Sequence, residues 1–142
     1  MQPTAQAVVE SSKIARREET GMARSPRPET DAPLPLMREL RWSGSEKAVA
    51  RKVFDRALQA ELTELVKKAK SMAAKIEEPA DLWDLEDYLT KRRMQINRKY
   101  DYRYSVLPSV FANLVREGRL SEEDLRGLSE DKLRYVRLQS RL

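Results

Sequence analysis

The sequence predicts an all-α protein, a small helical bundle with a long amphipathic first helix. Charged residues make up 36% of the 142 residues, aromatic residues only 6%, and there are four glycines. This composition, with almost no runs of β-branched residues, favours helices over sheets. From about residue 43 onward, apolar residues recur at spacings of three and four, which is the period of an α-helix.

Residues 1–42 are expected to form a disordered, proline-rich tail. Five of the seven prolines fall in this segment, namely Pro3, Pro26, Pro28, Pro33 and Pro35. Such a polar segment buries too little apolar surface to offset the entropy of ordering it. A short helix could form around residues 5–17, although it would have little to pack against. The functional alternative is a tether or docking arm.

The helical domain is expected to span residues 43–142 and to open with a helix that runs to about residue 76. Ser43, followed three residues later by Glu46, is a capping-box pattern. The apolar stripe of this helix comprises Val53, Phe54, Ala57, Leu58, Leu62, Leu65, Val66, Ala69, Met72, Ala73 and Ile76. About 30 helical residues would extend roughly 45 Å, which is more than the width of a 100-residue domain. The helix should therefore protrude or lie along a second molecule.

A second helix is expected over about residues 79–99, because proline suits the first turn of a helix and disfavours helix before it. One narrow stripe of this helix is apolar and carries Leu82, Leu85, Leu89, Ile96 and Tyr100. The opposite side carries Trp83, Asp87, Thr90 and Met94, flanked by Glu86 and Arg93. A surface helix normally exposes lysine and glutamate there, so this second face is predicted to bind a partner.

A third helix is expected over about residues 105–117. Pro108 fits only in its first turn, where the missing N–H is not needed. Gly118 is the expected residue at which this helix ends. A short helix capped by Ser121 should then end near residue 128.

A last helix, capped by Ser129, should run to about residue 140. Leu133, Val136 and Leu138 are expected to face inward. Because a bundle of this size has a thin core, the long amphipathic helix makes a homodimer, with antiparallel chains, the expected assembly.

The residue content argues against an enzyme. The chain has no cysteine and no histidine, which removes the thiolate nucleophile, the commonest general base and the commonest metal ligand. No glycine-rich phosphate loop, nucleophile elbow or zinc-helix motif is present. No catalytic residue, cofactor, metal or small-molecule substrate is therefore expected. The acidic residues at 81, 84, 86 and 87 are interpreted as a solvated helix start favoured by the helix dipole.

The predicted location is the cytoplasm, without membrane insertion. No apolar run approaches the ~20 residues that span a bilayer, and the N-terminus lacks the apolar core of a signal peptide. A net charge of +5 is compatible with an acidic protein surface or with nucleic acid. The basic run Lys91-Arg92-Arg93, continued by Arg98, Lys99 and Arg103, keeps open the alternative of a basic helical dimer that binds nucleic acid. The acidic residues upstream in the same helix argue against this alternative, because they make the helix dipolar in charge rather than uniformly basic.

Trp83, Asp87 and Arg93 form the candidate partner-binding site. Tryptophan and arginine are the residue types that dominate interface hot spots, and a guanidinium can bind a carboxylate through two parallel hydrogen bonds. The structural alternative is that Trp83 packs against the long helix of a second chain in a dimer.

Several strings of residues resemble one family, the fluorescence recovery protein of cyanobacterial photoprotection. In the second helix these are Asp81-Leu82-Trp83-x-Leu85-x-Asp87-Tyr88-Leu89 and Arg93. After it they are Lys99-Tyr100-Asp101-x-Arg103-x-Ser105-Val106, Val110-Phe111-Ala112 and Glu117-Gly118. Further agreement lies at Trp42-Ser43, Phe54-x-x-Ala57-x-Gln59-x-Glu61-Leu62, Glu123-x-Leu125-x-x-Leu128 and Asp131-Lys132. The resemblance covers about residues 42–142 with essentially no gaps.

The resemblance implies a small helical dimer without enzymatic chemistry. It implies binding to the photoactivated red form of the orange carotenoid protein, mainly to its C-terminal domain. Binding would speed the return to the orange resting form and help to release that quencher from the phycobilisome, which ends non-photochemical quenching. The family's tryptophan, aspartate and arginine patch falls on Trp83, Asp87 and Arg93.

Three residues depart from the family pattern. Glu86 stands where the family often has histidine, Ser109 where it has an aromatic residue on the third helix, and Tyr135 where it has a lysine on the last helix. The family resemblance implicates the aromatic residue in partner contact. A divergent member that regulates another protein partner is therefore the alternative to an orange carotenoid protein regulator.

Overall fold

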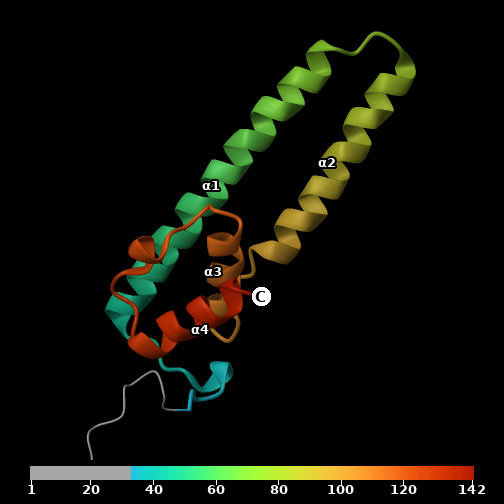
Figure 1. Cartoon of the computed structure of the whole chain (residues 1–142). Helices are drawn as coiled ribbons and strands as arrows, with labels where there is room; N and C mark the ends of the chain where they lie inside the picture. Colours follow the sequence, from blue (N-terminus) through green and yellow to red (C-terminus); the bar gives the residue numbers. More distant parts are fainter. Residues whose placement is uncertain (1–32) are drawn as a thin grey trace, which may run out of the picture. The chain divides into compact units, whose positions relative to one another are not determined.

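The computed structural model describes residues 33–142, and the regular elements in this range are helices (Figure 1). In chain order they are the 3₁₀ helix η2 (Met37–Glu39), α1 (Gly44–Ala74), α2 (Pro79–Lys99), α3 (Leu107–Arg116), the 3₁₀ helix η3 (Glu122–Leu125) and α4 (Glu130–Ser140). The predicted all-α fold class is confirmed. The helix considered around residues 5–17 lies outside the described residues, whereas residues 33–42 of the expected tail are described.

The predicted capping box at the start of α1 is present. The Ser43 hydroxyl accepts the Glu46 N–H at 3.1 Å, and the Glu46 carboxylate accepts the Ser43 N–H at 3.0 Å. These two bonds satisfy donors that a helix N-terminus otherwise leaves without partners. α1 then continues for 31 residues and ends at Ala74, two residues before the expected end.

α2 begins and ends where the sequence predicted. Pro79 lies in its first turn, and the Asp81 carboxylate accepts the N–H groups of Glu77 and Glu78 at 3.0 and 3.1 Å. These backbone hydrogen bonds hold the pKa of Asp81 below its usual value. Asp81 therefore lies in the first turn of α2, in agreement with the interpretation of the acidic residues as a helix start.

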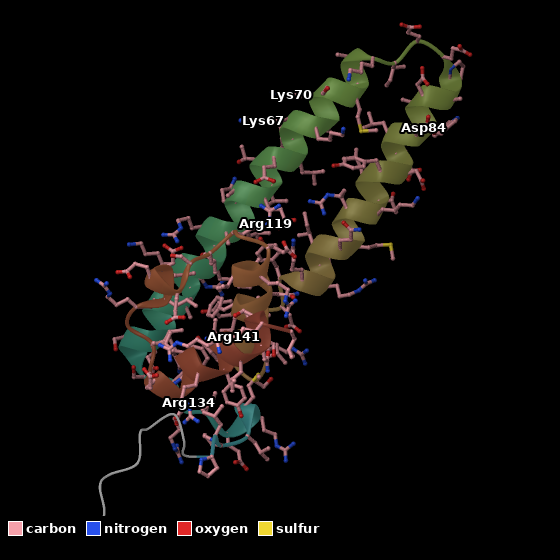
Figure 2. All side chains as sticks on the ribbon, viewed as in Figure 1. Lys67, Lys70, Asp84, Arg119, Arg134 and Arg141 are labelled. Atoms are coloured by element: carbon pink, nitrogen blue, oxygen red, sulfur yellow. The ribbon has the colours of Figure 1, made fainter. Side chains whose placement is uncertain are left out.

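α1 and α2 form an antiparallel hairpin joined by residues 75–78 (Figure 1). α3 and α4 lie beside the end of the hairpin that is opposite this connection, next to the N-terminal half of α1. The distal half of the hairpin therefore projects beyond them, with Lys67 and Lys70 on α1 and Asp84 on α2 (Figure 2).

The core lies where α3 and α4 meet α1 and the end of α2. It contains Ala50, Val53, Phe54, Ala57, Ile96, Tyr100, Leu107, Val110, Phe111, Ala112, Leu114, Leu120, Leu125, Leu128 and Val136. Phe111 and Leu114, one turn apart on α3, are completely buried. Burying a side chain of this size contributes about 1.5–3 kcal/mol, so α3 is the central element of the core although it has only 10 residues.

Aromatic side chains fill the connection between α2 and α3. The Tyr102 ring lies 4.8 Å from the Phe54 ring and 5.6 Å from the Tyr104 ring, both edge to face. The Arg51 guanidinium lies 3.7 Å from the centre of the Tyr102 ring. Burial is the main cause that raises the pKa of the Tyr102 hydroxyl to about 12. This packing fixes the segment where the helical pattern breaks.

Several residues expected to face inward are exposed in the single chain. Val66 on α1, Leu82 and Leu89 on α2 and Leu138 on α4 are all at least a third exposed, so these expectations were wrong for the isolated chain. The reason is length, because α1 extends about 46 Å at 1.5 Å per residue whereas α3 extends about 15 Å. The short helices therefore cannot cover the apolar side chains in the part of α1 and α2 that projects beyond them.

The sequence signals after α2 were found at the right positions, but the predicted helices were longer than the observed ones. α3 starts at Leu107, two residues later than expected, with Pro108 in its first turn. It ends before Gly118, whose φ of 79° is a left-handed conformation that favours glycine. The expected short helix is a single 3₁₀ turn capped by Ser121.

Ser129 precedes α4 as predicted, but its side chain makes no capping bond. Its N–H instead donates to the Glu46 carboxylate at 2.8 Å, and the buried Lys132 ammonium donates to the same carboxylate at 2.9 Å. Burial would by itself raise the pKa of Glu46, but the hydrogen bonds from Ser43, Lys132 and Ser129 lower it to about 2. This ion pair joins the N-terminus of α4 to the start of α1.

Candidate functional site

A groove of about 630 Å³ runs between α1 and α2. Five of its nine lining residues are apolar and come from both helices, and the lining residues are Leu58, Leu62, Leu65, Glu86, Leu89, Thr90, Arg93, Ile96 and Asn97. Arg93 is the one cation among these nine residues. An apolar groove with a few polar groups is typical of a binding surface.

The structure separates the three predicted site residues. Arg93 lines the groove, whereas Trp83 and Asp87 do not. Trp83 is 63% exposed, and the Asp87 carboxylate forms an exposed ion pair with Lys91 at 3.0 Å. At 3.6 residues per turn, Trp83 lies about 80° and Asp87 about 120° around α2 from Arg93. Trp83 lies between Arg93 and Asp87 in this projection, so the three side chains fall within one third of the circumference of α2.

Large apolar side chains are exposed on both helices that form the groove. Besides Trp83 they are Val66, Leu82, Leu89 and Met94. Clusters of exposed apolar side chains in a soluble protein mark interaction surfaces. The hairpin formed by α1 and α2 is therefore the candidate interaction surface of the described chain.

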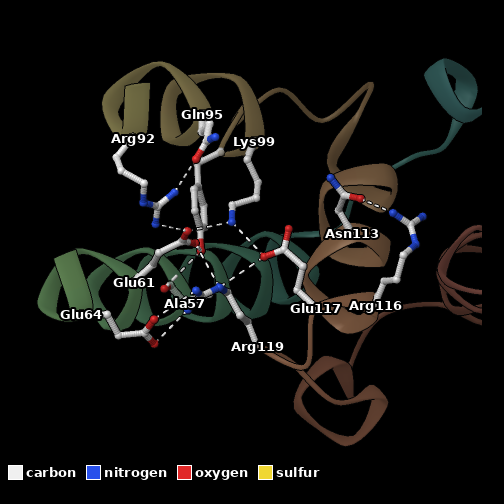
Figure 3. A network of polar contacts seen from close by, with 11 residues as sticks. Ala57, Glu61, Glu64, Arg92, Gln95, Lys99, Asn113, Arg116, Glu117 and Arg119 are labelled. Carbon is white, nitrogen blue, oxygen red and sulfur yellow. Dashed lines mark hydrogen bonds and ion pairs between the residues drawn. The ribbon is translucent and has the colours of Figure 1, made fainter. Parts of the chain in front are cut away.

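A buried carboxylate of α1 lies at the centre of a polar network that joins α1 to the C-terminal half of α2 (Figure 3). Glu61 of α1 is only 1% exposed. Its carboxylate accepts hydrogen bonds from the Tyr100 hydroxyl at 2.7 Å, the Lys99 ammonium at 2.8 Å and the Arg92 guanidinium at 3.0 Å. The guanidinium of Arg119, in the loop after α3, lies 3.2 Å away.

This cluster was not predicted, although the sequence carries a signal for it. Glu61 falls four residues after Ala57 and four before Leu65, in the middle of the apolar stripe of α1. A charge at such a position is rarely buried unless it is paired. The basic run of α2 supplies two of its partners, so Arg92 and Lys99 turn toward α1 while Arg93 turns into the groove.

The Glu61 cluster predicts acid-sensitive stability. Burial would by itself raise the pKa of Glu61, but hydrogen bonds from Lys99, Tyr100 and Arg92 outweigh it and lower the pKa to about 2. A carboxylate with a lowered pKa stabilises the fold above its unfolded value of 4.5, and this contribution is lost as the pH falls toward 2. Denaturant unfolding between pH 5 and pH 2 should show falling stability.

The free energy of unfolding should depend less steeply on pH in Glu61→Gln, because that variant has no carboxylate to protonate at this position. Glu46→Gln should also show a shallower dependence, since the pKa of Glu46 is lowered in the same way. An unchanged slope in both variants would contradict the assignment of acid sensitivity to these two groups.

Most of the basic run is neutralised within the chain. Four of its six cations form ion pairs, namely Lys91 with Asp87, Arg92 and Lys99 with Glu61, and Arg103 with Asp101. Cations paired in this way are poorly placed to contact a phosphate backbone. In the described residues there is also no cluster of three acidic side chains arranged to hold a metal ion, and no helix is long and apolar enough to cross a bilayer.

Comparison with known proteins gives concordant results. Residues 42–140 match the family described as photoprotection regulator fluorescence recovery protein. The fluorescence recovery protein of Synechocystis sp. PCC 6803 is 38% identical over 104 residues, which cover 73% of this chain and 95% of that protein. The structure of the Fremyella diplosiphon protein matches with a TM-score of 0.69 and 39% identity, over 72% of this chain and 100% of that chain.

The structure of the Synechocystis protein matches with a TM-score of 0.68 and 38% identity, again over 72% and 100% of the two chains. The resemblance identified from the sequence motifs is therefore confirmed by overall sequence and by fold. The chain belongs to the fluorescence recovery protein family, whose members are photoprotection regulators.

Proposed function

We propose that this chain is a non-enzymatic regulator that binds the photoactivated orange carotenoid protein, mainly its C-terminal domain. It accelerates the return from the red to the orange form and detachment from the phycobilisome. The observation that carries the proposal is the family match over residues 42–140. Partner binding is assigned to Trp83, Asp87 and Arg93.

The mechanism requires no reacting side chain. A protein that binds an intermediate on the return path more tightly than it binds the red starting form lowers the barrier to return. Each tenfold acceleration requires about 1.4 kcal/mol of such preference for the transition state. Arg93 can supply it through paired hydrogen bonds to a carboxylate or to backbone carbonyls.

The first test is binding to the two forms of the purified carotenoid protein. Size-exclusion chromatography under actinic light should show a complex, and the same mixture in the dark should show a weaker one or none. Equal binding to both forms would contradict selective binding to the photoactivated form.

We also propose that the chain works as an antiparallel homodimer in which a second copy packs on the exposed apolar side chains of α1 and α2 and leaves Arg93 accessible to the partner. The exposed Val66, Leu82 and Leu89 would then become buried, as the sequence pattern predicts. Trp83 lies beside this surface, and the structural alternative places it at the chain–chain contact. The alternatives are distinguished by tryptophan fluorescence while the protein is diluted through the concentrations at which the dimer dissociates. Trp42 is first replaced by phenylalanine, so that Trp83 is the remaining tryptophan, and its emission should change on dissociation only if it lies within the chain–chain contact.

Leu89→Glu should convert the dimer to a monomer, because it places a charge among the exposed apolar side chains that the second copy would cover. Sedimentation velocity at micromolar concentration should show the halved mass. Leu138→Glu is the matched control, because Leu138 is exposed on α4 and its replacement should leave the dimer intact. A dimeric Leu89→Glu protein would exclude this apolar surface of the hairpin as the interface.

The other two functional alternatives make different predictions. The alternative of a divergent member that regulates another protein partner is supported by Glu86. This residue lines the groove as a carboxylate and accepts a hydrogen bond from Thr90 at 2.8 Å. A basic nucleic-acid-binding dimer predicts binding to duplex DNA or RNA that weakens steeply with salt. The ion pairing of the basic run disfavours it, and the absence of gel retardation at low salt would eliminate it.

A further inference from the structure

Few apolar contacts hold α2 against α1. Among residues 79–99, Ile96 is the one residue that is buried. Leu89, on the apolar stripe of the same helix, lines the open groove and is 36% exposed. Close packing of interdigitated side chains is what normally fixes the orientation of one helix on another. Apolar packing therefore leaves the rotation of α2 about its own axis only weakly determined.

One oxygen atom of Glu61 instead ties α2 to α1 at two points. Glu61 Oε2 accepts hydrogen bonds from the Arg92 guanidinium at 3.0 Å and from the Lys99 ammonium at 2.8 Å (Figure 3). We call these three residues the Glu61 clamp. Arg92 and Lys99 are seven residues apart, so they leave α2 within about 20° of one direction and about 10 Å apart along its axis. Two attachments on one line fix the rotation of α2 as well as its axial position.

The Glu61 clamp is held in place by further contacts. The other carboxylate oxygen of Glu61 accepts a hydrogen bond from the Tyr100 hydroxyl at 2.7 Å and lies 3.2 Å from the Arg119 guanidinium. The Arg92 guanidinium also donates to the Gln95 side-chain oxygen at 2.7 Å. Glu61 is 1% exposed, and charged hydrogen bonds are stronger where water is excluded. The clamp is therefore a rigid support for α2.

Arg93 follows the clamp residue Arg92 directly in the sequence. One residue of an α-helix corresponds to a rotation of about 100°, so Arg93 is directed into the groove while Arg92 is held on Glu61. The α1 wall of the groove includes Leu58 and Leu62. An apolar wall limits the access of water to a guanidinium, which strengthens the hydrogen bonds that it forms with a partner. A turn of α2 about its axis would carry the guanidinium away from this wall.

We propose that Glu61 and Arg92 are positioning residues for partner binding, because the Glu61 clamp holds α2 at the rotation that presents Arg93 beside the leucines of α1. The inference rests on the proposed function, which assigns partner contact to Arg93. It extends the binding site from α2 to the α1 wall of the groove. Glu61 is buried and Arg92 turns toward α1, so both act through Arg93 rather than by touching the partner.

The test removes one cation of the Glu61 clamp from the full chain. In Arg92→Gln, the Glu61 carboxylate keeps its remaining partners, which are Lys99, Tyr100 and Arg119. The variant should therefore stay folded and keep its assembly, which circular dichroism and sedimentation velocity check.

Two further variants separate positioning from a general effect of charge. Arg92→Lys retains a cation that can pair with Glu61 and should restore the function of the clamp. Arg98→Gln is the matched control, because it removes one positive charge from an exposed position of the same helix.

The readout is the affinity for orange carotenoid protein that actinic light holds in the photoactivated form. Arg92→Gln should weaken binding about fivefold or more, whereas Arg92→Lys and Arg98→Gln should stay within about twofold of the unmodified chain. A double variant then combines Arg92→Gln with Arg93→Leu. If Arg92 acts through Arg93, this double variant should bind within about twofold of Arg93→Leu alone, since the effects of coupled residues do not multiply.

Each other outcome counts against a specific claim. Full affinity of Arg92→Gln, or an equal loss in Arg98→Gln, would overturn the positioning role while the proposed function stands. So would a further fivefold loss in the Arg93→Leu background, because it would mean that Arg92 contacts the partner itself or acts only through stability. An equal loss in Arg92→Lys would overturn charge pairing as the basis of the clamp. If the unmodified chain does not bind this partner, the proposed function fails and positioning toward this partner fails with it.

Discussion

Replacing Arg93 by leucine is expected to reduce the acceleration of red-to-orange return by more than tenfold. Arg93 is the only cation that lines the groove between α1 and α2, and truncating an interface arginine at a hot spot costs about 2 kcal/mol or more. That energy corresponds to roughly a 30-fold loss. The leucine side chain retains the apolar contacts of the groove, so folding and dimerisation should be normal.

Arg98→Leu is the matched control for this variant. Arg98 is exposed and lies about 140° around α2 from Arg93, so the Arg98→Leu variant should keep nearly full activity. Circular dichroism and sedimentation of both variants establish that fold and assembly are retained. Full activity of Arg93→Leu would show that the partner site has been placed on the wrong residue.

The variant Glu61→Gln is expected to be the most destabilising single change outside the apolar core. It leaves the cations of Arg92, Lys99 and Arg119 facing a neutral amide in a largely buried site. Removing one partner of a buried ion pair costs about 3–5 kcal/mol. For a domain of about 100 residues this lowers the Tm by about 12 °C or more.

Glu64→Gln provides the comparison one turn away. Glu64 pairs with Arg119 at 3.0 Å but is exposed, and exposed pairs contribute about 0–1 kcal/mol. Its Tm should therefore change by only a few degrees. The measurement is thermal unfolding at one fixed protomer concentration, because dimerisation makes the Tm depend on concentration. Equal shifts for the two variants would show that burial of Glu61 has no energetic consequence.

The helix boundaries that sequence reasoning placed well depend on local chemistry. Ser43 and Glu46 form the expected capping box, and Pro79 starts α2. Gly118 follows α3 with a positive φ. Each of these signals acts within a few residues of its own position, so it can be read without knowledge of the tertiary structure.

The features that sequence reasoning missed depend on residues far apart in the chain. The Glu61 cluster joins α1 to partners 31 to 39 residues away. The bond from Tyr135 to Pro35 spans 100 residues. A periodic pattern shows which side chains share a face, but it does not show which face of another element meets them.

The predicted binding site also combines features that the sequence reveals with features that only the tertiary structure reveals. Periodicity placed Trp83, Asp87 and Arg93 on α2, and the exposure of Trp83 agrees with the expected second face. Only the structure shows that Arg93 lines a groove with α1 while Asp87 pairs with Lys91. The expected inward positions of Leu82 and Leu89 were wrong for the single chain because a stripe does not reveal whether its cover comes from the same chain.

The most direct test of the central claim is the dark rate of red-to-orange return of the photoactivated orange carotenoid protein, measured by absorbance with and without this chain. The account predicts an acceleration of tenfold or more at a stoichiometric ratio, and this acceleration should be lost in Arg93→Leu. An unchanged rate in the presence of the folded, helical protein would contradict the proposed function. It would mean that this family member regulates a different protein.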